Sequence, residues 1–145
     1  ENVDEYLAKK KQRFLAQMEA CQREGRLFFA QEVTDEVLAY IQGEQEMGGG
    51  MRVGNIVYET KIPFLTKKYL AESDPLMKHY YYCHCPWARE AIKSGDKVAP
   101  IFCNCSAGFH KKPWEMALNQ KIQVDVLESV LRGDPHCRFV IHLPE

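Results

Sequence analysis

The residues most able to do chemistry in this sequence are its six cysteines. Four of them form two Cys-x-Cys pairs, Cys83 with Cys85 and Cys103 with Cys105, while Cys21 and Cys137 stand alone. A chain of 145 residues can bury a core without disulfide staples, so we expect reduced thiols and a cytoplasmic location. In that setting, clustered cysteines indicate a metal site or a reactive thiol.

Two residues near the C-terminus break the pattern of a predicted β-hairpin. Glu128 and Cys137 both fall on the otherwise apolar faces of the last two strands. The apolar faces of the two strands point to the same side of the sheet when Val130 lies opposite Cys137 and Phe139 lies opposite Glu128. This pairing makes Glu128 and Cys137 diagonal neighbours. A buried carboxylate needs a partner, and a shared metal ion would supply one. On the hairpin alone, a second interpretation stays open: Glu128 lies near the sheet end and reaches water or an arginine.

Thiolates are soft ligands suited to zinc, which binds four cysteines, or a mixture with histidine and carboxylate, in a tetrahedron. A Cys-x-Cys pair on a strand points both sulfurs to one side, but the two Cα atoms are about 6–7 Å apart, a wider arrangement than a Cys-x2-Cys knuckle. One sulfur of each pair can then ligate while the other supports it, with His136 as a secondary ligand. The candidate zinc ligands are Cys83, Cys85, Cys103, Cys105, Glu128 and Cys137.

The same thiols allow a catalytic or a redox interpretation. Cys103 or Cys105 could be a nucleophile whose pKa is lowered by a helix N-terminus or by the nearby His110, Lys111 and Lys112. A redox switch would need exposed thiols of low pKa.

Aromatic residues surround this cysteine-rich region. Trp87, Phe109 and Trp114 could line an apolar ligand pocket. Each of them taken alone is more typical of a core position.

The hydrophobic pattern predicts a single α+β domain over residues 1–145 with a helical N-terminal half. An amphipathic helix is expected over 3–26, with Cys21 on its apolar stripe, and a second helix from the N-cap Thr34 to a flexible connector at 48–50. A strand over 53–59 and a short helix over 63–72 follow. The C-terminal half is expected to form an antiparallel sheet with short helices: strands over 77–85 and 98–102, helices over 87–93 and 113–118, a loop over 106–112, and a closing hairpin with strands over 122–130 and 137–143.

Composition excludes several classes of protein. The 19 Lys and Arg against 20 Asp and Glu give a net charge of −1, which argues against a nucleic-acid or anionic-membrane partner. The 46% apolar and 27% charged residues exclude a largely disordered chain. No apolar run approaches the roughly 18 residues that cross a bilayer, and no signal peptide is recognisable. The chain opens at Glu1 without a methionine, which leaves an earlier segment or domain open. We expect a small-molecule ligand or substrate as partner, and a homo-oligomer stays open.

The sequence over about residues 77–143 resembles two known families. The strand ending at Glu128, the turn at Gly133 and the segment Cys137-Arg138-Phe139 are similar to the close of 4-vinyl reductase-type ligand-binding domains, which include the sensor domains of phenol-responsive transcription regulators. This resemblance implies a structural zinc near an aromatic pocket, with Cys105, Glu128 and Cys137 as ligands. That family has another cysteine shortly after the glutamate, where this chain has none, so Cys83, Cys85 or Cys103 would have to replace it.

A second resemblance rests on Cys85-Pro86-Trp87-Ala88-Arg89, on Phe102-Cys103 and on the segment from Gly133 to Phe139. These are similar to the bacterial L-2-amino-thiazoline-4-carboxylic acid hydrolase-like family. It implies, loosely, a hydrolase of a small cyclic amide- or thiazoline-like substrate that uses a thiolate or a metal-bound water. The sequence thus predicts a small-molecule-binding or sensor-like domain with a zinc-type cysteine site, and a hydrolase as the alternative. A structural site has four protein ligands, whereas a water-activating site leaves one position open.

Overall fold

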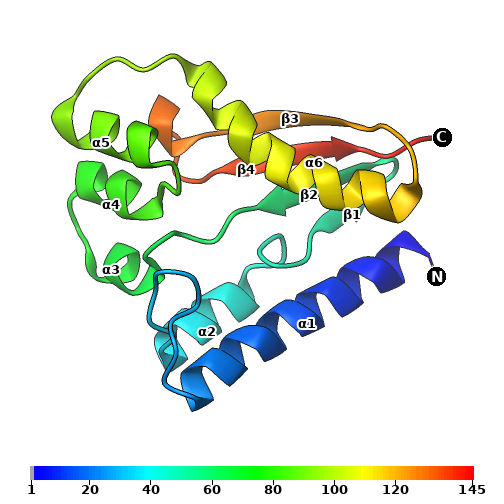
Figure 1. Ribbon diagram of the computed structural model, residues 1–145, viewed down its shortest axis with the longest axis horizontal. Coiled ribbons are helices and arrows are strands. Elements are labelled where there is room, and N and C mark those ends of the chain that lie inside the picture. Colours follow the sequence, from blue (N-terminus) through cyan, green and yellow to red (C-terminus); the bar gives the residue numbers. More distant parts are fainter. Residues whose placement is uncertain (1) are drawn as a thin grey trace.

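The computed structural model describes residues 2–145, which form a four-stranded antiparallel sheet with helices packed along it and around one end (Figure 1). The strand order is β1-β2-β4-β3, which places the last strand along the chain inside the sheet. The strands are β1 (Met51–Val53), β2 (Ile56–Thr60), β3 (Gln123–Glu128) and β4 (Arg138–His142). This architecture confirms the predicted α+β class with a helical N-terminal part.

Two well-capped helices open the chain, α1 (Val3–Arg23) and α2 (Asp35–Gly43). The Asn2 side chain accepts a hydrogen bond from the Glu5 amide at 2.9 Å, and Thr34 Oγ1 accepts one from the Val37 amide at 3.2 Å. Such caps satisfy amide groups that a helix start leaves unpaired. Both helices were predicted, and Cys21 is buried in their shared core as expected.

The glycines at 48–50 pack closely against α1. Gly48 has φ +71°, and a Cβ atom there would lie 2.4 Å from the Phe14 ring. Gly50 has φ +140°, and its Cβ would lie 3.0 Å from Leu7 Cδ2. Interpreting this segment as a merely flexible connector is therefore wrong, because the absence of side chains lets the backbone approach the helix.

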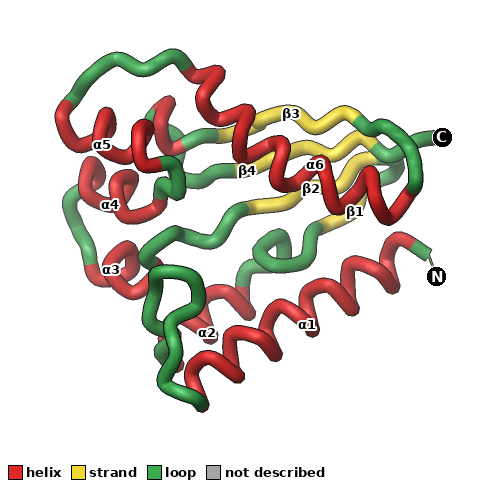
Figure 2. Tube along the Cα trace, in the orientation of Figure 1, coloured by secondary structure: helices red, strands yellow, loops and turns green. Residues whose placement is uncertain are grey.

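The C-terminal half contains more helix than the sequence predicted. Helices α3 (Thr66–Ala71), α4 (Pro75–Tyr82) and α5 (Pro86–Ser94) gather at one end of the sheet, and the long α6 (Asn104–Leu118) crosses it (Figures 1 and 2). Two 3-10 turns, η1 (Pro100–Cys103) and η2 (Val130–Arg132), precede α6 and follow β3.

Three predicted elements in this half are wrong. The predicted strand over 77–85 is α4 followed by a turn, and Asp74 caps that helix by accepting a hydrogen bond from the Met77 amide at 3.3 Å. The predicted strand over 98–102 ends in η1, which begins at Pro100. The predicted loop over 106–112 lies within α6, which continues through Gly108 and Pro113.

The closing hairpin forms, but with a different register from the predicted one. Val126 lies opposite Phe139 and Glu128 opposite Arg138, with an irregularity between Val126 and Glu128. A bulge inserts an extra residue into one strand and shifts every later pair. Val130 lies beyond the end of β3 and begins η2 instead of facing Cys137.

Helices α1 and α6 pack on the same face of the sheet. Leu7 of α1 and Trp114 of α6 share a core cluster with Val57 and Phe139, and the rings of Tyr6 and Trp114 lie 5.2 Å apart. Side chains from α1, β2 and α6 can therefore meet in one place.

Candidate functional site

Four of the six cysteines line one small cavity at the end of the sheet. They are Cys83 and Cys85 from the α4–α5 junction, Cys103 from the start of α6, and Cys137 just before β4. The cavity has a volume of about 20 Å³. A space of that size holds about one water molecule or one ion.

Two of these cysteines occupy the N-cap positions of helices. Cys85 precedes α5 and Cys103 precedes α6, and neither side chain makes a capping hydrogen bond. The N-terminal end of a helix carries partial positive charge, which attracts an anionic group placed next to it. The other two differ, since Cys83 follows the C-terminal end of α4 and Cys137 lies next to a strand.

One half-buried cation, Lys61, lines the same cavity. Its Nζ donates a hydrogen bond to Ser106 Oγ at 3.0 Å, its amide donates to the Cys137 carbonyl at 2.9 Å, and its own carbonyl accepts a hydrogen bond from the Tyr82 hydroxyl. Burial lowers the pKa of Lys61, and the surrounding thiols, Cys137 and Cys83 foremost, partly oppose that shift. The ammonium group supplies a counter-charge for thiolates in this cavity.

Burial favours the protonated form of two of the cavity thiols. Burial raises the pKa of Cys83 to about 11 and that of Cys137 to about 12. Cys103 is half-buried, and its Sγ lies 2.9 Å from Ser129 Oγ. Ser129 is fixed in turn, because its amide donates to Asp134 Oδ2 at 2.8 Å.

The four sulfurs border the cavity without forming a finished coordination shell. Within residues 2–145, no group of three or more His, Cys, Asp or Glu side chains is arranged to hold a metal ion as it stands. The predicted zinc remains a prediction.

Two predicted zinc ligands have other surroundings. Cys105 is exposed and lies along a groove on the outer side of α6, with Phe109 and Met116. Glu128 does line the cavity, but its Oε2 lies 3.7 Å from Nη1 of Arg138. This contact fits the second interpretation of Glu128, in which the carboxylate reaches an arginine.

The two histidines nearest the thiols serve packing. His84 lines the cavity, and its Nε2 lies 2.7 Å from the Ile62 carbonyl. Burial lowers the pKa of His84 to about 4, assisted by the charge of Lys61, so this ring is neutral at neutral pH. His136, the predicted secondary ligand, packs edge-on against Tyr82.

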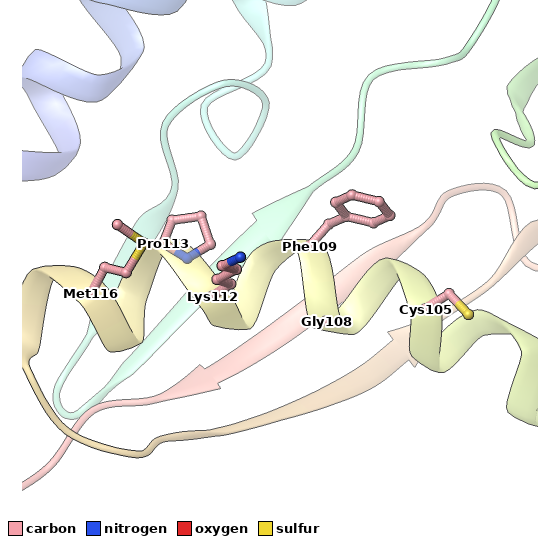
Figure 3. Close-up of a pocket in the computed structure, with 6 residues that line it drawn as sticks. All are labelled: Cys105, Gly108, Phe109, Lys112, Pro113 and Met116. Atoms are coloured by element: carbon pink, nitrogen blue, oxygen red, sulfur yellow. The ribbon is translucent and has the colours of Figure 1, made fainter.

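The three predicted pocket aromatics lie in three different settings. Trp114 is buried, with 1% of its surface exposed, whereas Trp87 and Phe109 are 72% and 77% exposed. Phe109 lines the open groove on α6, which has a volume of about 570 Å³ (Figure 3). The structure does not gather these residues around one site.

A buried network of hydrogen bonds and ion pairs, which the sequence analysis did not predict, lies beside the thiol cavity. The Glu59 carboxylate on β2, 4% exposed, accepts hydrogen bonds from Lys10 of α1, from His110 Nδ1 at 2.5 Å and from Trp114 Nε1 at 2.8 Å. The His110 ring also stacks on Phe139 at 4.4 Å. Burial acts to raise the pKa of Glu59, but the hydrogen bonds and charges of His110 and Lys10 outweigh it, so the pKa is lowered.

A sequence signal for this network existed. Glu59 falls on the same predicted strand face as Val57, so a period-2 pattern places a carboxylate in the core, where it requires partners. Lys61 follows at the next position of that face. The partners of Lys61 could not be named from the sequence, because they come from α6 and from the α4–α5 junction.

In comparison with known proteins, residues 66–145 match the model of a family of unknown function, DUF6144. This span contains all four cavity cysteines but neither Lys61 nor Glu59. No curated protein and no solved structure matches the chain. Among the described residues, no helix combines the length and apolar character needed to cross a membrane.

Proposed function

The chain belongs to the DUF6144 family of unknown function, and we propose that it is a metal-binding domain whose thiol cavity holds one zinc-type ion. The observation that carries the proposal is the convergence of four cysteines, from three separate segments, on a cavity of about 20 Å³. Thiolates are soft ligands that select zinc and similar ions. A pocket for an organic molecule typically has hundreds of cubic ångströms, so the occupant is a single ion.

The charges around the cavity suit a thiolate-bound ion. Four thiolates around a divalent cation leave a net charge of about −2, since each thiolate contributes one negative charge. The Lys61 ammonium and the N-terminal ends of α5 and α6 offset part of that charge. A bound metal ion deprotonates its thiols, which overrides the burial that raises the pKa of Cys83 and Cys137.

The proposed role of the ion is structural. Four cysteine ligands complete the tetrahedron of zinc and leave no position for a reacting water. The sulfurs must close toward the cavity centre, because zinc–sulfur bonds are about 2.3 Å long. The ion would link the α4–α5 junction, the start of α6 and β4, so its binding energy would add to the stability of the fold.

Elemental analysis and thiol counting test this proposal. Protein purified without added metal should contain about one zinc per chain, with four thiols that react only after chelation. Cys83→Ser, Cys85→Ser, Cys103→Ser and Cys137→Ser should each lower the zinc content. Cys105→Ser is the matched control and should leave it unchanged, because Cys105 lies outside the cavity. Folded protein with no metal and with the cavity thiols freely titratable would reject the metal site.

A second function, thiol-dependent hydrolysis, is favoured by the setting of Cys103. This thiol is half-buried at the N-terminal end of α6, and Ser129 Oγ lies 2.9 Å away. Alkylation of the metal-free protein by iodoacetamide at pH 7 tests it, with the exposed Cys105 as internal reference. Faster alkylation of Cys103 than of Cys105 would support an activated nucleophile, and slower alkylation would contradict it.

A further inference from the structure

Helix α6 carries a continuous row of residues on its outer side. Its members alternate between spacings of three residues and one residue, which keeps them on one side of the helix. They line the groove of about 570 Å³ and are Cys105, Gly108, Phe109, Lys112, Pro113 and Met116 (Figure 3). We call this row the outer stripe. Phe109 is 77% exposed and Met116, two turns further along the same side, is 74% exposed. Exposed apolar side chains that share one surface indicate a contact with a partner.

We propose that the outer stripe binds the outer stripe of a second copy of this chain, with the two α6 helices antiparallel. In a two-fold symmetric contact, residue i of one copy meets residue j of the other, and j meets i. Centred on the stripe, this arrangement pairs Cys105 with Met116, Gly108 with Pro113, and Phe109 with Lys112. The six positions therefore form three different pairs, each of them made twice.

Two of these pairs match a small residue with a larger one. A Cβ atom at Gly108 would meet nothing within 4 Å, so the chain's own fold does not require glycine there. The hollow that glycine leaves on the outer surface can accept the Pro113 ring of the second copy. Cys105 is likewise smaller than the Met116 side chain that it would face. Close helix packing relies on this interlocking of ridges and hollows.

The third pair supplies charge complementarity and selects the antiparallel orientation. An ammonium group is attracted to the face of an aromatic ring, so Lys112 of one copy can lie over Phe109 of the other. The Phe109 ring already attracts a cation within its own chain, because Lys61 Nζ lies 5.8 Å from the ring centroid. A parallel pairing would instead place Lys112 against Lys112, and the like charges would repel.

The contact is short, which sets the expected strength of association. At 1.5 Å per residue, the span from Cys105 to Met116 is only about 17 Å long. Ile101, in the turn just before α6, is a further exposed apolar side chain, 69% exposed. We therefore expect a reversible dimer that depends on protein concentration. The cavity cysteines take no part, so this inference stands independently of the proposed metal site.

Sedimentation equilibrium over a range of protein concentrations tests the pairing. The mass should rise from 16.8 kDa toward twice that value. Phe109→Lys should make the protein monomeric, because two lysines then face each other, and the exchange Phe109→Lys with Lys112→Phe should restore the dimer. Leu76→Lys is the control: Leu76 is 44% exposed on α4 and off the stripe, so this variant should dimerise normally. Circular dichroism verifies that each variant is folded.

Three results would overturn the proposal: a monomer at every concentration, a Phe109→Lys variant that dimerises like the unaltered protein, or an exchanged variant that stays monomeric. The register has a separate test. Under the thiol oxidant diamide, a Met116→Cys variant should form an intermolecular disulfide with Cys105, identified by peptide mapping. A link between the two Cys105 residues in the unaltered protein would contradict this register.

Discussion

Replacing Glu59 with glutamine tests how strongly the buried network joins α1, the sheet and α6. Glutamine keeps the shape of the side chain and removes its negative charge. Lys10 and His110 then lose an anionic partner, while the amide oxygen can still accept the Trp114 N–H. The variant therefore measures the charge of the network with little change in packing.

The expected loss follows from the exposure of the partners. A hydrogen bond to a charged group contributes about 1.5–3 kcal/mol to stability, and breaking a buried ion pair costs about 3–5 kcal/mol. Lys10 is 27% exposed and reaches water, so its share is reduced, whereas His110 is only 16% exposed. We expect Glu59→Gln to lower the free energy of unfolding by about 2–4 kcal/mol. At roughly 2–4 °C per kcal/mol, a loss of about 3 kcal/mol lowers Tm by roughly 6–12 °C.

Urea denaturation at pH 7, followed by the fluorescence of the buried Trp114, measures this loss. The matched control is Asp125→Asn, the same exchange in a pair with His142 where the Asp125 side chain is 52% exposed. An exposed pair contributes at most about 1 kcal/mol, so the control should change little. A Glu59→Gln variant within about 0.5 kcal/mol of the unaltered protein would refute the view that this network stabilises the fold.

Three further changes probe other parts of the molecule. The pKa of Glu59 is lowered in the folded state, so its contribution to stability is present above the unfolded pKa of about 4.3 and is lost as pH falls through the folded pKa. Urea titrations between about pH 5 and 2 should therefore show the unaltered protein losing more stability than Glu59→Gln. Parallel losses in the two proteins would contradict this. Gly48→Ala should lower stability by about 1–3 kcal/mol in thermal melts, since alanine is strained at φ +71° and would collide with Phe14. Gly43→Ala is the control and should be neutral or stabilising, because Gly43 has a helical backbone and open space around it. Lys11→Met should lower stability by about 1–3 kcal/mol, because Lys11 Nζ donates to the carbonyls of Ile41, Glu44 and Met47 at 2.6, 2.8 and 2.5 Å. Lys67→Met removes only an exposed pair with Glu32 and should have a smaller effect. Equal losses of stability in the two variants would argue against a stabilising role for the Lys11 hydrogen bonds.

Elements marked by local signals were the ones that the sequence could predict. Asn2 is the N-cap of α1 and Thr34 that of α2, and the apolar spacing after each is helical. The prediction of a strand over 77–85 was wrong because it rested on Tyr81, Cys83 and Cys85, which recur at every second position as on one face of a strand. The stronger signals, an aspartate at N-cap Asp74 and a proline at the first helical position, identify α4.

Long-range features were beyond the sequence. The hairpin pairs Val126 with Phe139, with an irregularity before Glu128, and no local residue pattern reveals this register. The meeting of Cys83, Cys103 and Cys137 at one cavity depends on how α4, α6 and β4 pack together. Spacing within each Cys-x-Cys pair could suggest that thiols matter, but it could not exclude Cys105, whose side chain faces outward only because residues 104–118 form a helix.

The strand order has a consequence for where this protein can be cut. The family match starts at residue 66, so it includes β3 and β4 and leaves out β1 and β2. A fragment that began there would keep two strands of the four and expose the edge of β4 that β2 covers. A bare pair of strands is marginally stable, and an uncovered edge invites association with other chains. The span that defines the family is thus shorter than the unit that completes the sheet.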